Sequence, residues 1–188
     1  MKLTNAMEPA VKAHLNRLRI EFHDAAAICW CPLCRADMMA FALSALPPRY
    51  GTRRNAAVAP GSEQDTAVAE EVSRAVRKIS LHPKHTPDAP APDQDPVFVV
   101  NFPLEESFRA VDALIEPDAE TCSCWDCRCD AVAFALNRYP ARYGVEHHGE
   151  THLRESDRVI MREELGQFLG IARRVVATVP RHQLHSVA

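Results

Sequence analysis

The chain has 188 residues, of which 47% are hydrophobic and 25% charged, and its formal net charge is −3. This composition is typical of a soluble globular protein, and the charge excludes a general attraction to nucleic acid or to anionic membranes. We find neither a membrane-spanning run nor the apolar core of a signal peptide. We therefore expect a cytoplasmic protein, in which clustered cysteines stay reduced and act as metal ligands or redox groups.

The sequence contains one segment twice, at an offset of 93 residues. The first copy reads Cys-Trp-Cys-Pro-Leu-Cys-Arg-Ala-Asp from Cys29, and the second reads Cys-Ser-Cys-Trp-Asp-Cys-Arg-Cys-Asp from Cys122. Ala-Phe-Ala-Leu and then Arg-Tyr-Gly follow in both copies, and the alignment needs no gap. The repeat predicts two structural units of one kind, which we place at residues 1–81 and 97–188.

In the first unit, apolar residues at steps of four, three and four predict a helix over 11–22. Pro32 suits the first turn of a second helix over 32–46, which two prolines then end. Arg-Tyr-Gly at 49–51 is predicted to form a turn. An apolar stripe over 68–79 predicts a third helix.

Residues 82–96 are rich in proline and predict a semi-rigid, extended linker. The apolar run at 97–100 predicts at most an extended segment. In the second unit, the offset of 93 predicts helices around 104–115, 125–139 and 161–172. We therefore expect an all-α fold of two small domains, each built as helix, cysteine knuckle, helix, turn and helix. The domains are expected to pair as an internal pseudo-dimer or between chains.

All seven cysteines lie in the two repeated clusters. Cys-x-Cys places two thiols on one side of an extended segment, and Cys-x-x-Cys brings a third to the start of the next helix, where the helix dipole favours a thiolate. Zinc takes four ligands in a closed structural site. The predicted metal ligands are Cys29, Cys31, Cys34, Cys122, Cys124, Cys127 and Cys129.

The fourth ligand of each site stays open at this point. In the second unit Cys129 is available, but it lies about 200° from Cys127 on a regular helix. Ala36 occupies the corresponding position of the first unit. The candidates there are His23, His82, His85 and a group from the other unit. The alternatives to zinc are an iron–sulfur cluster, a redox dithiol and free thiols in the core.

Asp37 and its copy Asp130 follow the last shared cysteine by three residues, on the same helical face. An acid in the first turn interacts favourably with the helix dipole. The other interpretation is an ion pair or an outer-shell bond to an arginine such as Arg35 or Arg49.

Arg49 and Tyr50, and their copies Arg142 and Tyr143, have two interpretations. Arginine offers a planar fork for phosphate, and tyrosine offers a ring on which a base can stack. Alternatively, each tyrosine packs against its knuckle and each arginine interacts with the end of a helix.

The motif Cys-x-Cys-x-x-Cys-x-x-Asp, followed by Ala-Phe-Ala-Leu and Pro-x-Arg-Tyr, resembles the late competence protein family ComFB, at residues 29–50 and 122–143. Members of that family are typically small helical domains that dimerise and bind zinc through the cysteines. Some look like receptors for cyclic dinucleotides, chiefly cyclic di-GMP, in the regulation of competence, motility or pili. The chain departs from the family at Ser44, where asparagine is common, although Asn137 keeps it. It also has a glycine after each tyrosine, and Ala141 in place of a proline.

The resemblance implies a fused tandem regulatory protein that binds a cyclic dinucleotide and signals to a protein partner. The candidate ligand contacts are Arg49, Tyr50, Arg142 and Tyr143. We see no catalytic constellation and expect no enzyme activity. The alternatives are a zinc-stabilised protein-interaction module without a small ligand, and a thiol redox protein.

Overall fold

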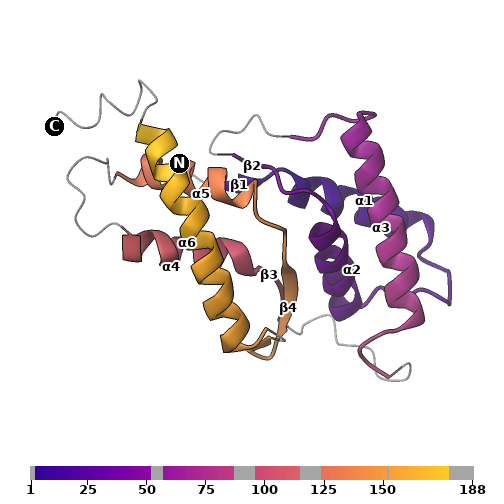
Figure 1. Ribbon diagram of the computed structural model, residues 1–188. Helices are drawn as coiled ribbons and strands as arrows, with labels where there is room; N and C mark the ends of the chain where they lie inside the picture. Colours follow the sequence, from indigo (N-terminus) through magenta and orange to yellow (C-terminus); the bar gives the residue numbers. More distant parts are fainter. Residues whose placement is uncertain (1–2, 52–56, 87–95, 115–123, 152, 178–188) are drawn as a thin grey trace.

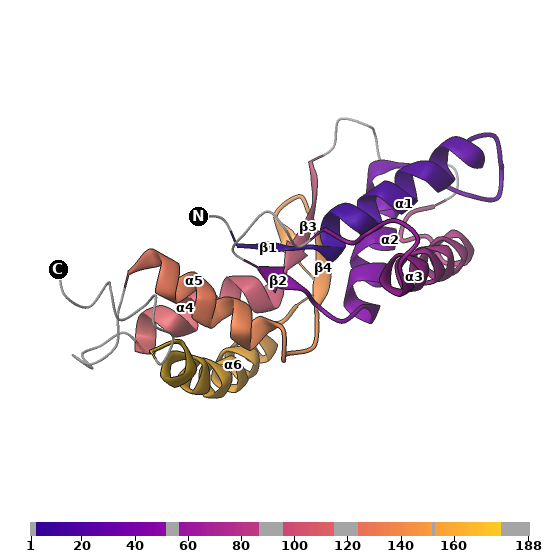
Figure 2. The same ribbon diagram turned by 90° about the horizontal axis from the view of Figure 1, so that it is seen from above.

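The computed structural model describes residues 3–51, 57–86, 96–114, 124–151 and 153–177, which form two units that lie side by side (Figures 1 and 2). The first unit consists of β1 (Thr4–Asn5), α1 (Met7–Glu21), α2 (Pro32–Ala45), β2 (Tyr50–Gly51) and α3 (Glu63–Leu81). The second consists of β3 (Val97–Asn101), α4 (Phe102–Leu114), α5 (Trp125–Leu136), β4 (Tyr143–His147), β5 (Glu150–Thr151) and α6 (Glu155–Ala177). No described helix has both the length and the apolar character of a membrane span.

The predicted helices are present, and their ends follow local chemistry. Helix α2 begins at Pro32 and ends at Ala45, because Leu46 precedes a proline and is extended, with ψ 143°. Helix α3 starts after Ser62, whose hydroxyl accepts a hydrogen bond from the backbone N–H of Asp65 at 3.2 Å. Helix α5 ends at Leu136, three residues earlier than expected.

The expectation of an all-α fold holds only roughly, because the described residues also form two small antiparallel sheets. One sheet pairs β1 with β2, and the other has the order β3-β4-β5. The predicted Arg-Tyr-Gly turns are wrong: Tyr50 and Tyr143 each begin a strand. Their partners in the ladders, Asn5 and Asn101, lie far away in the sequence, so local periodicity carried no sign of the pairing.

The strand pairing also corrects the register of the repeat. Since Asn5 is opposite Tyr50 and Asn101 is opposite Tyr143, α1 and α4 correspond at an offset three residues longer than that of the cysteines. Accordingly, the buried residues Val11 and Leu15 correspond to the buried residues Ser107 and Val111. The apolar pattern of the sequence could not reveal this shift. Three residues are close to one helical turn, so a shift by three keeps the apolar residues on the same face of the helix.

Each unit has its own core, and a third apolar cluster joins them. The largest fully buried side chains of the first core include Met38, Leu43, Val11, Val68 and Val72, and those of the second include Leu136, Val132, Met161, Leu165 and Leu169. Between them, Ala36 and Ala40 of α2 pack with Val145 of β4. Figures 1 and 2 show the β3–β4 ribbon beside α2. The small alanine side chains allow this close approach between helix and sheet.

The two units exchange equivalent contacts within the chain. Asn137, which follows α5, hydrogen-bonds the backbone of Tyr50, and Ser44, near the end of α2, hydrogen-bonds the backbone of Tyr143. Ser44 and Asn137 are corresponding residues of the repeat, as are the two tyrosines. Tyr50 also joins the buried cluster of the second unit. The repeat is therefore paired by reciprocal contacts inside one chain.

Candidate metal site

The cysteine knuckle of the first unit forms the entry to α2. Cys31 is the N-cap residue of this helix, in an extended conformation, and its sulfur accepts a hydrogen bond from the N–H of Cys34 at 3.5 Å. Cys34 is buried within the first turn. The extended residue before the helix and the helical turn after it turn the three sulfurs of the motif toward one point, as the spacing predicted.

The structure brings His85, rather than His23 or His82, to these sulfurs. The Nε2 atom of His85 lies 3.3 Å from Cys29 Sγ, 3.5 Å from Cys31 Sγ and 3.1 Å from Cys34 Sγ. His85 belongs to the segment after α3 that we had assigned to the linker. By contrast, the ring of His23 contacts Asp24 and the carbonyl of Ile20.

The four ligand atoms fit one tetrahedral ion. They all lie within 4.8 Å of one another. With Zn–S and Zn–N bonds of about 2.3 and 2.0–2.1 Å, a tetrahedron separates sulfur from nitrogen by about 3.6 Å, close to the distances found here. The Nδ1 atom of His85 donates to the carbonyl of Thr86 at 2.7 Å, which orients the ring with its Nε2 atom toward the sulfurs. These residues can therefore hold a metal ion, and their chemistry is compatible with zinc.

The electrostatics of the cluster favour a cation. Burial, followed by the neighbouring Cys31 and Cys29, raises the pKa of the Cys34 thiol well above its ordinary value. Three thiolates at this distance repel one another unless a positive charge lies between them. A divalent cation held by these residues would supply that charge and would favour the deprotonated thiolates that coordinate it.

Asp37 and Lys84 form an ion pair beside the cluster and link α2 to the segment that carries His85. Lys84 Nζ donates to Asp37 Oδ1 at 2.6 Å, and the side chain of Asp37 is only 5% exposed. The expected arginine partners, Arg35 and Arg49, do not make this contact. Because Lys84 precedes His85 directly, the pair anchors the chain where the histidine must reach the sulfurs.

The described part of the second unit repeats the knuckle but not the histidine. Cys124 is the N-cap residue of α5, and its sulfur accepts from the N–H of Cys127 at 3.5 Å, as in the first unit. Cys127 and Cys129 are buried, and burial chiefly raises the pKa of the Cys129 thiol. Cys122 lies outside the described residues. Within them the Cys29–His85 group is the one cluster of this kind, so metal binding by the second unit stays a prediction.

The arginines that we proposed as ligand contacts directly precede strands β2 and β4, and each side chain contacts a residue of its own unit. The side chain of Arg49 donates to Gln64 at the start of α3. Arg142 is exposed, with its guanidinium carbon 5.9 Å from the ring centroid of Tyr139. Their backbone carbonyls accept hydrogen bonds from the N–H groups of Ala6, the N-cap residue of α1, and Phe102, the first residue of α4. Both side chains thus lie near positions where strand and helix meet.

The two tyrosines lie together in a hydrogen-bond network that crosses the units. Their hydroxyl oxygens are 3.5 Å apart. Asn101 donates to both hydroxyls, Asn5 donates to that of Tyr143 at 2.9 Å, and Tyr143 donates to Glu8 at 2.8 Å. Burial is the main cause that raises the pKa of each tyrosine. The hydroxyls therefore serve the contact between units, and ligand binding by the tyrosines stays a prediction.

Our sequence reasoning missed the asparagines of this network. Asn5 and Asn101 each precede the first helix of a unit, and each side-chain oxygen accepts from a backbone N–H of that helix, at 3.2 Å. An asparagine just before an amphipathic stripe is a recognised sign of a helix start and was present in the sequence. Nothing local indicated that the side chain of Asn5 reaches Tyr143, or that the side chain of Asn101 reaches both tyrosines.

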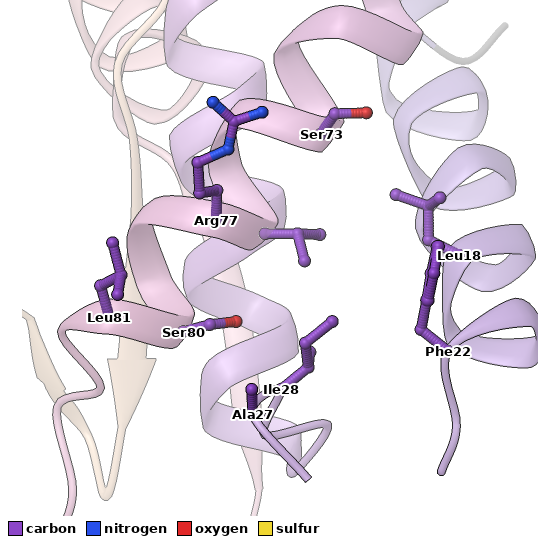
Figure 3. Close-up of a pocket in the computed structure, with 9 residues that line it drawn as sticks. Leu18, Phe22, Ala27, Ile28, Ser73, Arg77, Ser80 and Leu81 are labelled. Atoms are coloured by element: carbon purple, nitrogen blue, oxygen red, sulfur yellow. The ribbon is translucent and has the colours of Figure 1, made fainter. Parts of the chain in front are cut away.

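An apolar groove of about 460 Å³ lies next to the knuckle, between α1 and α3. Figure 3 shows Leu18 and Phe22 of α1 facing the side chains of α3, with Ala27 and Ile28 at one end. The residues from α3 are Ser73, Val76, Arg77, Ser80 and Leu81. Since Ile28 directly precedes Cys29, the metal knuckle also shapes this recess.

The comparisons with known proteins agree with this architecture. The model of the family described as late competence development protein ComFB matches residues 4–83 and 104–180, one segment in each unit. His85 lies just beyond the first match. Searches of curated proteins and of solved structures found no match. The matched segments cover most of the chain, which therefore belongs to the ComFB family and carries its domain in duplicate.

Proposed function

We propose that the chain is a non-catalytic regulatory protein whose first unit is held together by one zinc ion, bound by Cys29, Cys31, Cys34 and His85. One observation carries the proposal: the Nε2 atom of His85 lies within 3.5 Å of the Sγ atoms of all three cysteines in the first knuckle. Four protein ligands close a tetrahedral site, which is the form that structural zinc takes. Such a site stabilises a domain of this size, whose core alone buries little apolar surface.

The mixed ligand set favours zinc over the alternatives. One imidazole with three thiolates is a common structural zinc set, whereas iron–sulfur clusters are mostly held by four cysteines. A redox dithiol needs a nucleophilic thiolate that a partner can reach. Cys34 is buried and its pKa is raised, which argues against that role.

Family membership supports a finer proposal: the two units together bind a cyclic dinucleotide, with cyclic di-GMP as the leading candidate, and pass the signal to a protein partner. Arg142 is exposed and Arg49 is half-buried, and the guanidinium group of each offers the planar fork that suits a phosphate. The runner-up is a zinc-stabilised protein-interaction module, for which the apolar groove between α1 and α3 is the supporting feature.

Metal analysis of two histidine variants tests the zinc site. We expect His85→Ala to lose one zinc per chain relative to the wild type, or to weaken its retention against a chelator by at least about 100-fold, because even outer-shell changes cost 10–100-fold. His82→Ala is the matched control, since His82 is exposed and only three residues away. Equal zinc content and retention in both variants would remove His85 from the site.

Calorimetry with cyclic di-GMP tests the nucleotide proposal on zinc-loaded protein. We expect Arg49→Ala with Arg142→Ala to weaken binding at least tenfold while zinc content stays unchanged. Arg19→Ala, on the exposed face of α1, is the control. If the wild type gives no binding heat and no thermal stabilisation, the protein-interaction module becomes the better description.

A further inference from the structure

The nucleotide proposal gives no role to the apolar groove between α1 and α3. The volume of this groove, about 460 Å³, lies within the range of about 300–1,000 Å³ that small-molecule sites occupy. Phe22 and Leu81 line the groove, and they are 41% and 71% exposed. Large apolar side chains that line a recess and stay in contact with water are typical of a surface that another apolar group covers. The groove therefore suits an apolar ligand.

The two ends of the groove differ in polarity. Figure 3 shows Ala27 and Ile28 at one end, whereas Ser73 and Arg77 extend from α3 toward the other. The wall that α1 provides between these ends is apolar, with Leu18 facing α3. A ligand that matches this arrangement is apolar along most of its length and carries one polar group at its end.

Among the described residues that line the groove, Arg77 alone is charged. Its guanidinium group forms no ion pair within the described part of the chain, whereas the neighbouring Arg74 pairs with Glu71. A guanidinium keeps its positive charge at every physiological pH and can bind a carboxylate through two parallel hydrogen bonds. One free guanidinium matches the single negative charge of a carboxylate rather than the nearly two charges of a phosphate monoester.

The second unit does not repeat this charge. At the offset of 93, Arg77 corresponds to Gly170 of α6, although the fully buried Val72 corresponds to the fully buried Leu165. The helix therefore packs on its core in both units, and the fold does not require an arginine at this position. Since only the first unit has the guanidinium group, we expect one ligand per chain.

We propose that the groove binds a medium-chain fatty carboxylate, with the alkyl chain between α1 and α3 and the carboxylate at Arg77. The alkyl chain runs past Phe22 toward Ile28 and covers apolar side chains that otherwise contact water. Because Ile28 directly precedes Cys29, the ligand also packs against the segment that leads into the metal knuckle. The site lies within the first unit and does not depend on the proposed nucleotide binding.

Trp30 offers a reporter for this test, because its Nε1 atom donates to the carbonyl of Phe22 at 3.2 Å. The other tryptophan, Trp125, belongs to the second unit, so Trp125→Phe leaves a full-length chain with one tryptophan. Its fluorescence and thermal stability are followed with dodecanoate, octanoate and dodecyltrimethylammonium, all below their micellar concentrations.

We expect dodecanoate to bind at one per chain, to raise Tm, and to bind at least tenfold more tightly than dodecyltrimethylammonium, whose head group is repelled by Arg77. Octanoate should bind at least about 30-fold more weakly than dodecanoate, because each methylene removed from water contributes about fourfold in affinity. Equal affinity for the two head groups overturns the proposal, as does an absence of dodecanoate binding.

Two variants locate the ligand in the groove. Arg77→Met removes the charge but keeps an apolar stem, and we expect it to bind the two twelve-carbon compounds equally. Arg19→Met is the matched control, because the exposed Arg19 lies outside the groove, and it should keep the preference for dodecanoate. An unchanged preference in Arg77→Met overturns the assignment of the carboxylate to that residue.

Ser73→Phe fills the groove from α3. The change is expected to cost little stability, because the exposed Ser73 hydroxyl donates only to the carbonyl of Ala69 in its own helix, at 2.8 Å. We expect this variant to keep its zinc content and to weaken dodecanoate binding at least tenfold. If it binds dodecanoate as tightly as the parent chain does, the ligand does not occupy the groove and the inference is wrong.

Discussion

The side chain of Asn137 in the second unit holds both backbone groups of Tyr50 in the first. Its Oδ1 atom accepts from the N–H of Tyr50 at 2.6 Å, and its Nδ2 atom donates to the carbonyl of Tyr50 at 3.0 Å. Ser44, the corresponding residue of the first unit, binds the N–H and the carbonyl of Tyr143 at 2.9 and 3.4 Å with a single hydroxyl. Serine at position 44 therefore keeps the contact with a shorter side chain and with longer hydrogen-bond distances than asparagine at position 137.

Asn137→Ala is expected to destabilise the protein by about 1–3 kcal/mol, because it leaves two backbone groups at the contact without partners. For a chain of this size that lowers Tm by roughly 2–4 °C per kcal/mol. Ser44→Ala is expected to act in the same direction with a smaller effect. Asn16→Ala on the exposed face of α1 is the control for urea or thermal unfolding. If Asn137→Ala and the control unfold alike, the reciprocal contact does not stabilise the pairing.

Glu106 is a charged residue whose side chain is fully buried in the second unit. Arg162 Nη2 lies 2.6 Å from its Oε2 atom, and Arg158 and Arg109 lie 3.3 and 3.1 Å from its Oε1 atom. The arginines are partly exposed, so the network joins α4 to α6 at the edge of the core.

Glu106→Gln is expected to cost about 3 kcal/mol, because breaking a buried pair leaves charge uncompensated. Glu105→Gln offers the matched comparison, since the exposed Glu105 contacts the same Arg158 at 3.2 Å and should cost less than about 1 kcal/mol. Urea unfolding at neutral pH checks both values. If the two variants lose the same free energy of unfolding, burial of Glu106 is not what makes its ion pairs matter for stability.

Gly144→Ala is expected to destabilise by about 1–3 kcal/mol through overpacking. A Cβ atom on this residue would lie 2.5 Å from Cε2 and 2.7 Å from Cζ of Phe102, whose ring is rigid and buried. Adding Phe102→Leu should recover part of the loss in a double-mutant cycle by thermal unfolding. Additive losses would show that the ring is not the cause. Gly144 is thus explained by packing rather than by a turn.

The Asp65 carboxylate connects α3 to α1 and to the preceding loop. His14 Nε2 lies 2.6 Å from one of its oxygens, and the N–H of Gly61 donates to the other at 2.8 Å. The hydrogen bond to His14 is the first cause that lowers the pKa of Asp65 below its ordinary value of 3.8.

We expect Asp65→Asn to lower stability at neutral pH and to make stability less sensitive to acid. A depressed folded-state pKa stabilises the protein fully above the unfolded value, and this stabilisation is lost as the pH falls through the folded pKa. The difference in urea midpoint between wild type and variant should therefore shrink below about pH 4. Asp24→Asn, at an exposed site, is the control. A difference that stays constant from pH 6 to pH 2.5 would contradict the role of this carboxylate.

Much of the site could be predicted because its signals are local. Three cysteines within six residues, with a proline in the first helical turn, are close in space whatever the rest of the chain does. The end of α2 was also predictable from neighbouring residues, because Pro47 disfavours a helical conformation at Leu46. His85 was one of several candidates, since no local pattern distinguishes it from His23 or His82. His85 reaches the sulfurs because α3 packs along α2 and because Lys84, the residue before it, pairs with Asp37.

By itself, the sequence determined that there are two units of one kind, with three helices each, and that each begins its second helix with a cysteine knuckle. Periodicity, capping and ligand spacing are properties of neighbouring residues, and a repeat shows them twice. Only the tertiary structure decided the strand pairing, the shifted register of α4, the exchange of contacts by Ser44 and Asn137, and the groove between α1 and α3. These depend on contacts between residues distant in the chain, whose loop-closure cost is offset only when both cores have formed.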